Sequence, residues 1–146
     1  MELDASVSMH FNGDCREALE FYGRLLGVKL EFVLTWGESP MAADAPPSWH
    51  DKVLFARLKG RKLDLIGADA LPGTYRPPVG FNLSLSTADL KETQRFFAEL
   101  ARGGVVHRPL AETFWALRYG YVTDRFGIPW EINCDKPHRP GAGAEP

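Results

Sequence analysis

Two carboxylates with a matched spacing are the residues of this chain best placed to do chemistry. Asp64 lies in the motif Leu-Asp-Leu, and Glu131 lies in the motif Trp-Glu-Ile. Each follows a glycine, Gly60 or Gly127, by four residues. A pair of carboxylates can hold a divalent cation through oxygen ligands, and one of them can act as a general base. Each is equally well explained as an isolated carboxylate paired with Lys or Arg.

Four further side chains are candidates for a polar site. His10 and Asn82 alternate with apolar residues on two predicted strands, so each should lie on the strand face that is turned away from the helices. A strand histidine is also commonly just a hydrogen-bonded residue, and an asparagine amide is a better hydrogen-bonding group than a metal ligand. Trp115 and Tyr119 alternate with Tyr121 on one face of a third strand, where they would line a site or fill a core.

The sequence pattern of the helices and strands that must position these residues occurs twice in the chain. The motif Asp-x-x-Glu begins at Asp14 and again at Asp89, each time opening a run with apolar residues on one helical face. An aspartate at this place accepts a hydrogen bond from a first-turn N–H, so helices are predicted at 14–26 and 89–101. The constant spacing indicates two copies of one supersecondary unit, each too small to bury its own apolar face.

Alternating apolar residues bounded by turn residues predict eight strands. They lie at 5–12, 28–36, 52–59 and 62–68 in the first half, and at 79–86, 104–109, 114–123 and 128–134 in the second. Each half therefore reads βαβββ. Residues 70–78, rich in proline, should link unit one (5–69) to unit two (79–135). A single domain is expected over 1–135, with a flexible tail at 136–146.

Composition excludes several classes of partner. The 146 residues carry a net charge of −2, which gives no electrostatic footprint for nucleic acid or an anionic membrane. No apolar stretch approaches the roughly 18 residues of a membrane span, and the first residues do not resemble a signal peptide. A cytoplasmic protein is expected. Cys15 and Cys134 have no metal-ligand spacing, so buried reduced thiols are predicted.

Longer stretches at both ends of the chain carry a family resemblance. They are Phe11-Asn-Gly-Asp-Cys-Arg-Glu-Ala-Leu-Glu-Phe-Tyr22, Glu112-Thr-Phe-Trp115, Asp124-Arg-Phe-Gly-Ile-Pro-Trp130 and Ile132-Asn-Cys134. The chain resembles, from about residue 6 to 135, the PhnB-like branch of the vicinal oxygen chelate (glyoxalase/bleomycin resistance/dioxygenase) superfamily. The resemblance implies an α+β fold in which two tandem βαβββ units form curved mixed sheets around a common cleft. This branch often carries a demethylubiquinone methyltransferase-like label, but no glycine-rich loop is present to hold a methyl donor's nucleoside.

The resemblance also implies a site. In the superfamily, metal ligands come from the first and last strands of each unit. Glu131 stands where relatives place the last-strand Glu, Asp64 matches the acidic position of unit one, and Asn82 replaces a usual His. The implied metal ligands are Asp64, Glu131 and His10, which suit Mn²⁺ or Mg²⁺ better than tetrahedral Zn²⁺. A non-haem iron dioxygenase needs two well-placed His residues, and this chain lacks the second.

Three functions stay open at this level. The first is the binding of a small polar molecule in an aromatic-lined cleft by Asn82, His10, Trp115, Tyr119 and Arg118. The second is a divalent-metal-dependent lyase, isomerase or transferase of glyoxalase type, with Asp64 and Glu131 as catalytic residues. The third is an interaction protein without a cleft ligand. The segment 38–49 would be a lid or a surface excursion. A homodimer is expected, because relatives commonly pair and the last strands are rich in Trp and Phe.

Overall fold

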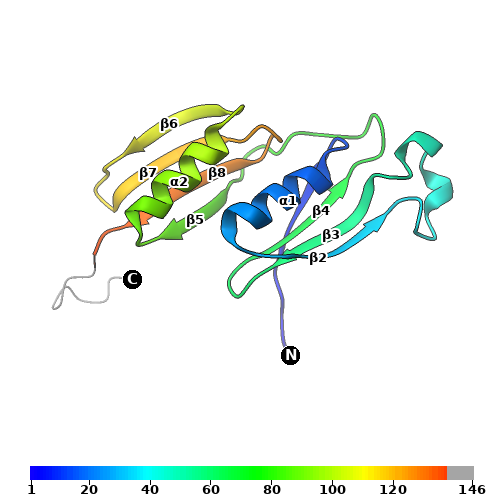
Figure 1. Cartoon of the computed structure of the whole chain (residues 1–146), viewed down its shortest axis with the longest axis horizontal. Coiled ribbons are helices and arrows are strands. Elements are labelled where there is room, and N and C mark those ends of the chain that lie inside the picture. The colour runs from blue at the N-terminus through cyan, green and yellow to red at the C-terminus, as the bar shows by residue number, and fades with distance from the viewer. Residues whose placement is uncertain (138–146) are drawn as a thin grey trace. The chain divides into compact units, whose positions relative to one another are not determined.

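The computed structural model describes residues 1–137 of the chain. The chain forms two compact units, and the boundary between them falls between Pro77 and Pro78. That boundary lies inside the linker predicted at 70–78. The greater part of the predicted tail, residues 138–146, lies outside the described residues. Figure 1 shows the elements of each unit in chain order.

Unit one contains one long helix and four strands in the predicted order. Its elements are β1 (Val7–Phe11), α1 (Cys15–Leu26), β2 (Leu30–Thr35), β3 (Val53–Lys59) and β4 (Asp64–Asp69), with two 3-10 helices, η1 (Ala42–Asp44) and η2 (Pro47–Trp49), between β2 and β3. The strand order in the sheet is β1-β4-β3-β2. β1 runs parallel to β4, whereas β3 is antiparallel to both of its neighbours. The sheet is therefore mixed.

Unit two repeats this plan. Its elements are β5 (Leu83–Thr87), α2 (Leu90–Ala101), β6 (Val105–Ala111), β7 (Ala116–Thr123) and β8 (Pro129–Asp135), and the strand order is β5-β8-β7-β6. β5 runs parallel to β8, and the other pairs are antiparallel. The α+β class and the tandem βαβββ order are confirmed. The cleft predicted between the units stays a prediction.

The two helices begin in different ways. The predicted cap is confirmed at Asp89, whose carboxylate accepts a hydrogen bond from the backbone N–H of Glu92 at 3.1 Å. The same prediction at Asp14 is wrong, since this side chain makes no cap bond in the described part of the chain. The carboxylate of Asp69 takes its place and accepts from the N–H of Cys15 at 3.0 Å. A distant strand thus supplies the cap, which a local motif cannot predict.

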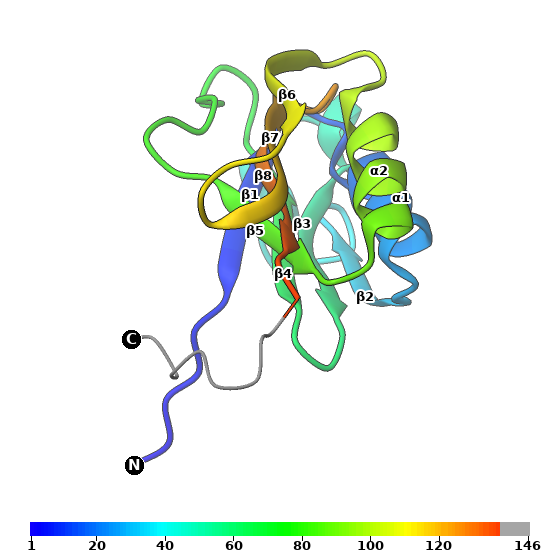
Figure 2. The same cartoon turned by 90° about the vertical axis from the view of Figure 1, so that its left-hand side faces the viewer.

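Each helix covers one face of its own sheet (Figures 1 and 2). The predicted alternation in β1 is confirmed, because Met9 and Phe11 are buried while Ser8 and His10 are exposed. The helix approaches so closely that a Cβ added to Gly67 would lie 2.8 Å from the sulfur of Cys15. The opposite side of each sheet is called here the helix-free face, and in unit one it carries Ser8 and His10.

The segment between β2 and β3 is fastened to its own unit. The indole N–H groups of Trp36 and Trp49 donate to the backbone carbonyls of Asp69 and Ala70, each at 3.1 Å. The imidazole Nε2 of His50 lies 2.9 Å from the carbonyl oxygen of Ala42. These bonds tie the loop to the end of β4, which favours a fixed surface excursion over a moving lid.

Candidate functional site

The hairpin registers show which residues of the two units correspond. In unit one, the turn closes with a bond from Gly60 N–H to Leu63 O, and β4 then begins at Asp64. In unit two, the equivalent bond runs from Asp124 N–H to Ile128 O, and β8 then begins at Pro129. Asp64 therefore corresponds to Pro129. The predicted correspondence of Asp64 with Glu131 is wrong, because the turn of unit two is longer and its glycine lies deeper in it.

The parallel strand pairs lead to the same correspondence. Ile66 of β4 lies opposite Ser8 of β1, and Glu131 of β8 lies opposite Ser84 of β5. Ser8 and Ser84 hold equivalent places on the helix-free faces of their strands. The residue of unit one that corresponds to Glu131 is thus Ile66, an apolar side chain.

Asp64 is a paired carboxylate. It accepts hydrogen bonds from the Nε and Nη2 atoms of Arg57 at 2.8 and 2.6 Å, and from the hydroxyl of Ser6 at 2.6 Å. The guanidinium of Arg57, helped by Ser6, holds the pKa of Asp64 well below its ordinary value. Both carboxylate oxygens are used in this arrangement. This is the alternative of a carboxylate paired with Arg.

The structure does not bring His10 to Asp64. His10 lies on β1 opposite Ala68, four residues along β4 from Asp64. Four residues of extended strand span about 13 Å, and the side chains stand roughly perpendicular to the sheet. His10 is exposed on the helix-free face of unit one. A single cation therefore cannot be shared by these two side chains without a change in the backbone.

Glu131 has a different environment, on the helix-free face of unit two. Its Oε1 atom accepts a hydrogen bond from the side-chain amide of Asn82 at 2.8 Å. Asn82 lies just before β5, because this strand begins later than predicted, after Gly80 takes a left-handed φ of 80°. Among residues 1–137 no ion pair is formed by Glu131. Its partner is thus a neutral amide.

An aromatic pair lies on the same face. The rings of Trp115 and Tyr119 are 5.2 Å apart in an edge-to-face arrangement, and the ring of Phe114 lies 4.9 Å from that of Trp115. The indole N–H of Trp115 donates to the side-chain oxygen of Asn133 at 3.1 Å. Burial, and after it the charge of Glu131, raises the pKa of Tyr119. The predicted residues Asn82, Glu131, Trp115 and Tyr119 are therefore all placed on one face of unit two.

Arg118 does not join this group. It lies opposite Cys134, which is buried under α2, and it alternates with Tyr119 along β7. Its guanidinium donates to the backbone carbonyl of the neighbouring Leu117 at 2.7 Å. Among residues 1–137 Arg118 forms no ion pair with Asp64 or Glu131, and the cation that pairs with Asp64 is Arg57. Arg118 is not on the face of Tyr119 because successive side chains of β7 point to opposite faces of the sheet.

Two residues of this face, Asn133 and His107, were not selected from the sequence. Asn133 orients the indole of Trp115, while Tyr121, which was named with Trp115 and Tyr119, lies directly opposite Glu131. His107 stacks on Tyr121 with ring centroids 4.6 Å apart. The alternation of Glu131 with Asn133 was the available signal for the first. The contact of His107 depends on a bulged pairing of β6 with β7, which no sequence pattern reveals.

The residues predicted to hold a metal do not fit one. In residues 1–137 there is no group of three or more His, Cys, Asp or Glu side chains arranged around a common point. The oxygens of Asp64 are committed to Arg57, and His10 lies farther along the sheet. Glu131 and Asn82 together offer two oxygen-bearing groups, whereas Mn²⁺ and Mg²⁺ prefer about six ligands. These side chains alone therefore do not complete the coordination of a divalent cation.

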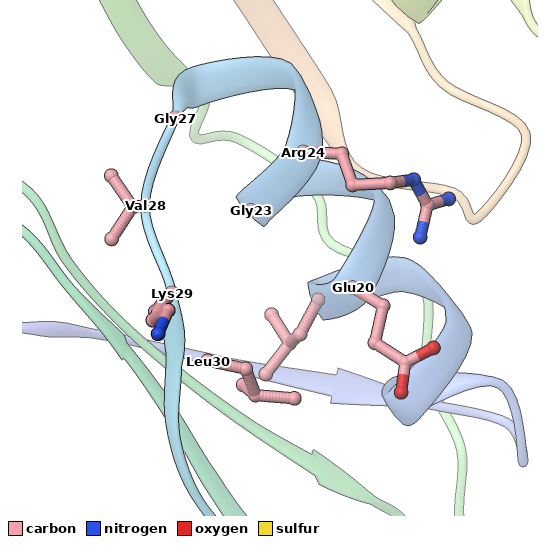
Figure 3. Close-up of a pocket in the computed structure, with 8 residues that line it drawn as sticks. Glu20, Gly23, Arg24, Gly27, Val28, Lys29 and Leu30 are labelled. Atoms are coloured by element: carbon pink, nitrogen blue, oxygen red, sulfur yellow. The ribbon is translucent and has the colours of Figure 1, made fainter.

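One hollow of unit one lies apart from these residues. A cavity of about 410 Å³ opens where α1 ends and the chain turns into β2. It is lined by Leu19, Glu20, Gly23, Arg24, Gly27, Val28, Lys29 and Leu30. Figure 3 shows Glu20 and Arg24 extending from the helix on the side away from Val28. A smaller hollow of about 290 Å³ lies at the start of α1. Neither contains a predicted site residue.

Fold and sequence together define the class of this protein. The model of the Glyoxalase/Bleomycin resistance protein/Dioxygenase superfamily matches residues 9–132, and the chain belongs to this superfamily. The resemblance stated from the sequence is confirmed at this level. No helix in residues 1–137 is long and apolar enough to cross a membrane.

Individual relatives cover almost the whole chain. Protein YjdN from Escherichia coli is 34% identical over 139 residues, which are 90% of this chain and 95% of YjdN. Protein PA1353 from Pseudomonas aeruginosa is 39% identical, with a TM-score of 0.84 over 93% of this chain and all of that one. The PhnB protein from Bacillus cereus is 16% identical, with a TM-score of 0.76 over 90% of this chain and 98% of that one, and shows a shared fold.

Proposed function

We propose that this protein binds a small polar molecule on the helix-free face of unit two. The supporting observation is the group formed by Glu131, Asn82, Trp115 and Tyr119. Glu131 offers a charged acceptor whose hydrogen-bond partner is a neutral amide. Trp115 is 49% exposed and forms the adjoining aromatic wall with Tyr119. A few polar groups beside aromatic surface are the usual composition of a small-molecule site.

Unit one supports the same role less well. Asp64 is compensated by Arg57, so its charge is not available to a ligand without breaking a bidentate pair. Ile66 stands in place of Glu131, and its neighbour on the same face, Ala68, is also apolar. His10 remains a candidate for ligand contact from this unit.

A compound screen tests the proposal. Thermal unfolding is followed for the wild type, Glu131→Gln and Asp64→Asn with a set of small polar compounds, because a ligand that binds the native state raises the melting temperature. Hits should lose their effect in Glu131→Gln and keep it in Asp64→Asn. If a compound loses its effect on the melting temperature equally in both variants, or in Asp64→Asn alone, the ligand does not bind at unit two's helix-free face.

The alternative is a divalent-metal-dependent lyase, isomerase or transferase of glyoxalase type. Superfamily membership and the oxygen atoms of Glu131 and Asn82 favour it. A thermal-shift titration with Mn²⁺, Mg²⁺, Ni²⁺ and Zn²⁺ separates the two functions. A rise in the wild type that is lost in Glu131→Ala supports the metal-dependent enzyme. If the rise is absent, the binding function stands alone.

We also propose a cytoplasmic homodimer. Cys15 and Cys134 are buried free thiols, as expected in a reducing compartment. The predicted reason for pairing needs correction, because Trp130 and Phe126 are buried in unit two. The apolar area is instead offered by Phe114, which is 89% exposed, and by its neighbour Trp115. Light scattering at micromolar concentration should give twice the chain mass, and Phe114→Ser should lower it towards the monomer.

A further inference from the structure

We propose that the ligand of unit two's helix-free face is an organic cation, such as a primary amine or a quaternary ammonium group. This inference rests on the proposed function and names the chemical class of its ligand. It is carried by one contrast: Asp64 has a cationic partner, and Glu131 has a neutral one. A partly buried carboxylate whose hydrogen-bond partner is a neutral amide keeps its net charge, so it still attracts a positive charge.

The aromatic wall selects an organic cation. Trp115 and Tyr119 meet at 67° with centroids 5.2 Å apart, so their two rings form a corner. The faces of such rings attract Lys-like and alkylated ammonium groups. The hydrogen bond from Trp115 to Asn133 holds the indole in this orientation. Carboxylate and rings together thus match a positive charge with an apolar body.

One cationic side chain lies near the same face. Arg108 of β6 is in register with Tyr121, and its charge acts on Tyr119 against the effect of Glu131. Within residues 1–137, Arg108 forms no ion pair with Glu131. It therefore leaves the carboxylate free for a ligand but opposes a ligand cation from a distance. Removing Arg108 should strengthen the binding of a cation.

Choline and its neutral isostere 3,3-dimethylbutan-1-ol provide matched probes. The fluorescence of the full chain is titrated with each, and Trp115→Phe identifies the part of the signal that comes from Trp115. Choline should bind at millimolar concentration and at least about tenfold more tightly than the alcohol. Added salt should weaken choline binding and leave the alcohol unaffected.

Three variants locate the interaction. Glu131→Gln should lower choline affinity about tenfold, because it removes the charge and keeps an acceptor for Asn82. Asp64→Asn is the matched control in unit one and should leave choline affinity within about twofold of the wild type. Arg108→Ala should raise choline affinity about twofold.

Two outcomes overturn the inference. If the neutral alcohol binds as tightly as choline and both depend on Trp115, the site exists but does not select a cation, so the proposed function stands and this inference falls. If choline does not bind up to 100 mM, or binds equally well to Glu131→Gln, the inference also falls. The compound screen then decides the proposed function separately.

Discussion

The helix-free faces of the two units are built on the same strand order but carry side chains of different chemical character. In unit two this face carries Glu131 and Tyr119 around a neutral amide and an aromatic corner. In unit one the place of Glu131 is taken by Ile66, and the carboxylate of Asp64 is paired with Arg57. The two units thus share their strand order and differ in the side chains of this face.

The buried sides show how far the equivalence goes. Each unit contains one aspartate that is almost fully buried and accepts three N–H bonds. Asp69 binds the backbone N–H groups of Gly13, Cys15 and Val53, whereas Asp124 binds those of Phe126 and Ile128 and the indole of Trp130. The first joins helix and strands, and the second closes a hairpin. Each unit thus uses a buried aspartate as the acceptor for N–H groups, but the two aspartates lie at different places in the fold.

The largest expected effect is on these aspartates. Asp69→Ala should lower the free energy of unfolding by about 4 kcal/mol. Asp69 is only 1% exposed, so the substitution leaves three backbone N–H donors without an acceptor at a buried place. Asp124→Ala should cost a similar amount. Urea unfolding measures both losses, and hydrogen exchange should rise first around α1 in one variant and around the β7–β8 hairpin in the other. Losses below about 1 kcal/mol would show that these carboxylates do not organise their units.

The glycines under the helices should respond unequally. A Cβ at Gly67 would lie 2.8 Å from the sulfur of Cys15, whereas at Gly120 it would lie 2.6 Å from the ring of Phe97. The register places Ala56 of unit one where unit two has Gly120. Gly67→Ala should therefore cost about 2 kcal/mol and Gly120→Ala about 1 kcal/mol, because the partly exposed ring can turn aside. A larger loss at Gly120 in urea unfolding would contradict the assigned equivalence.

The pair of Asp64 with Arg57 should appear as a pH dependence. The pKa of Asp64 is lowered in the folded chain, so its contribution to stability is fully present above the unfolded pKa of about 4. It is lost as the pH falls through the folded pKa. The melting-temperature difference between the wild type and Asp64→Asn should be constant above about pH 5 and shrink below pH 4. A difference that grows on acidification would contradict the pairing.

The smallest effect is expected at Glu131. Glu131→Gln should change the free energy of unfolding by less than about 0.5 kcal/mol, or raise it, because a ligand-facing charge contributes little to folding. Asp64→Asn should be destabilising in the same urea experiment. If Glu131→Gln costs more than Asp64→Asn, the assignment of the structural and the functional carboxylate is reversed.

The sequence predicted the fold well because its signals are local. Side-chain alternation assigned Ser8 and His10 to the correct face, and Asp89 caps its helix as expected. The candidate site was predicted less completely. Asn82 and Glu131 were both selected, and their hydrogen bond joins residues far apart in the chain. An arginine partner for Asp64 was one of the stated alternatives, but the sequence did not single out Arg57. The correspondence of Asp64 with Glu131 was wrong, since a turn of different length in each unit displaces a correspondence that is counted along the sequence.

Amide-resolved NMR can locate the bound ligand on one of the two units. The strongest hit of the compound screen is titrated into the labelled chain, and chemical-shift changes are mapped. We expect the largest changes on unit two's helix-free face, at residues 82–84, 115–121 and 131–133, and their loss in Glu131→Gln. The largest changes at Ser8, His10 and Ile66 of unit one, or around the hollow at Gly27, would contradict this expectation.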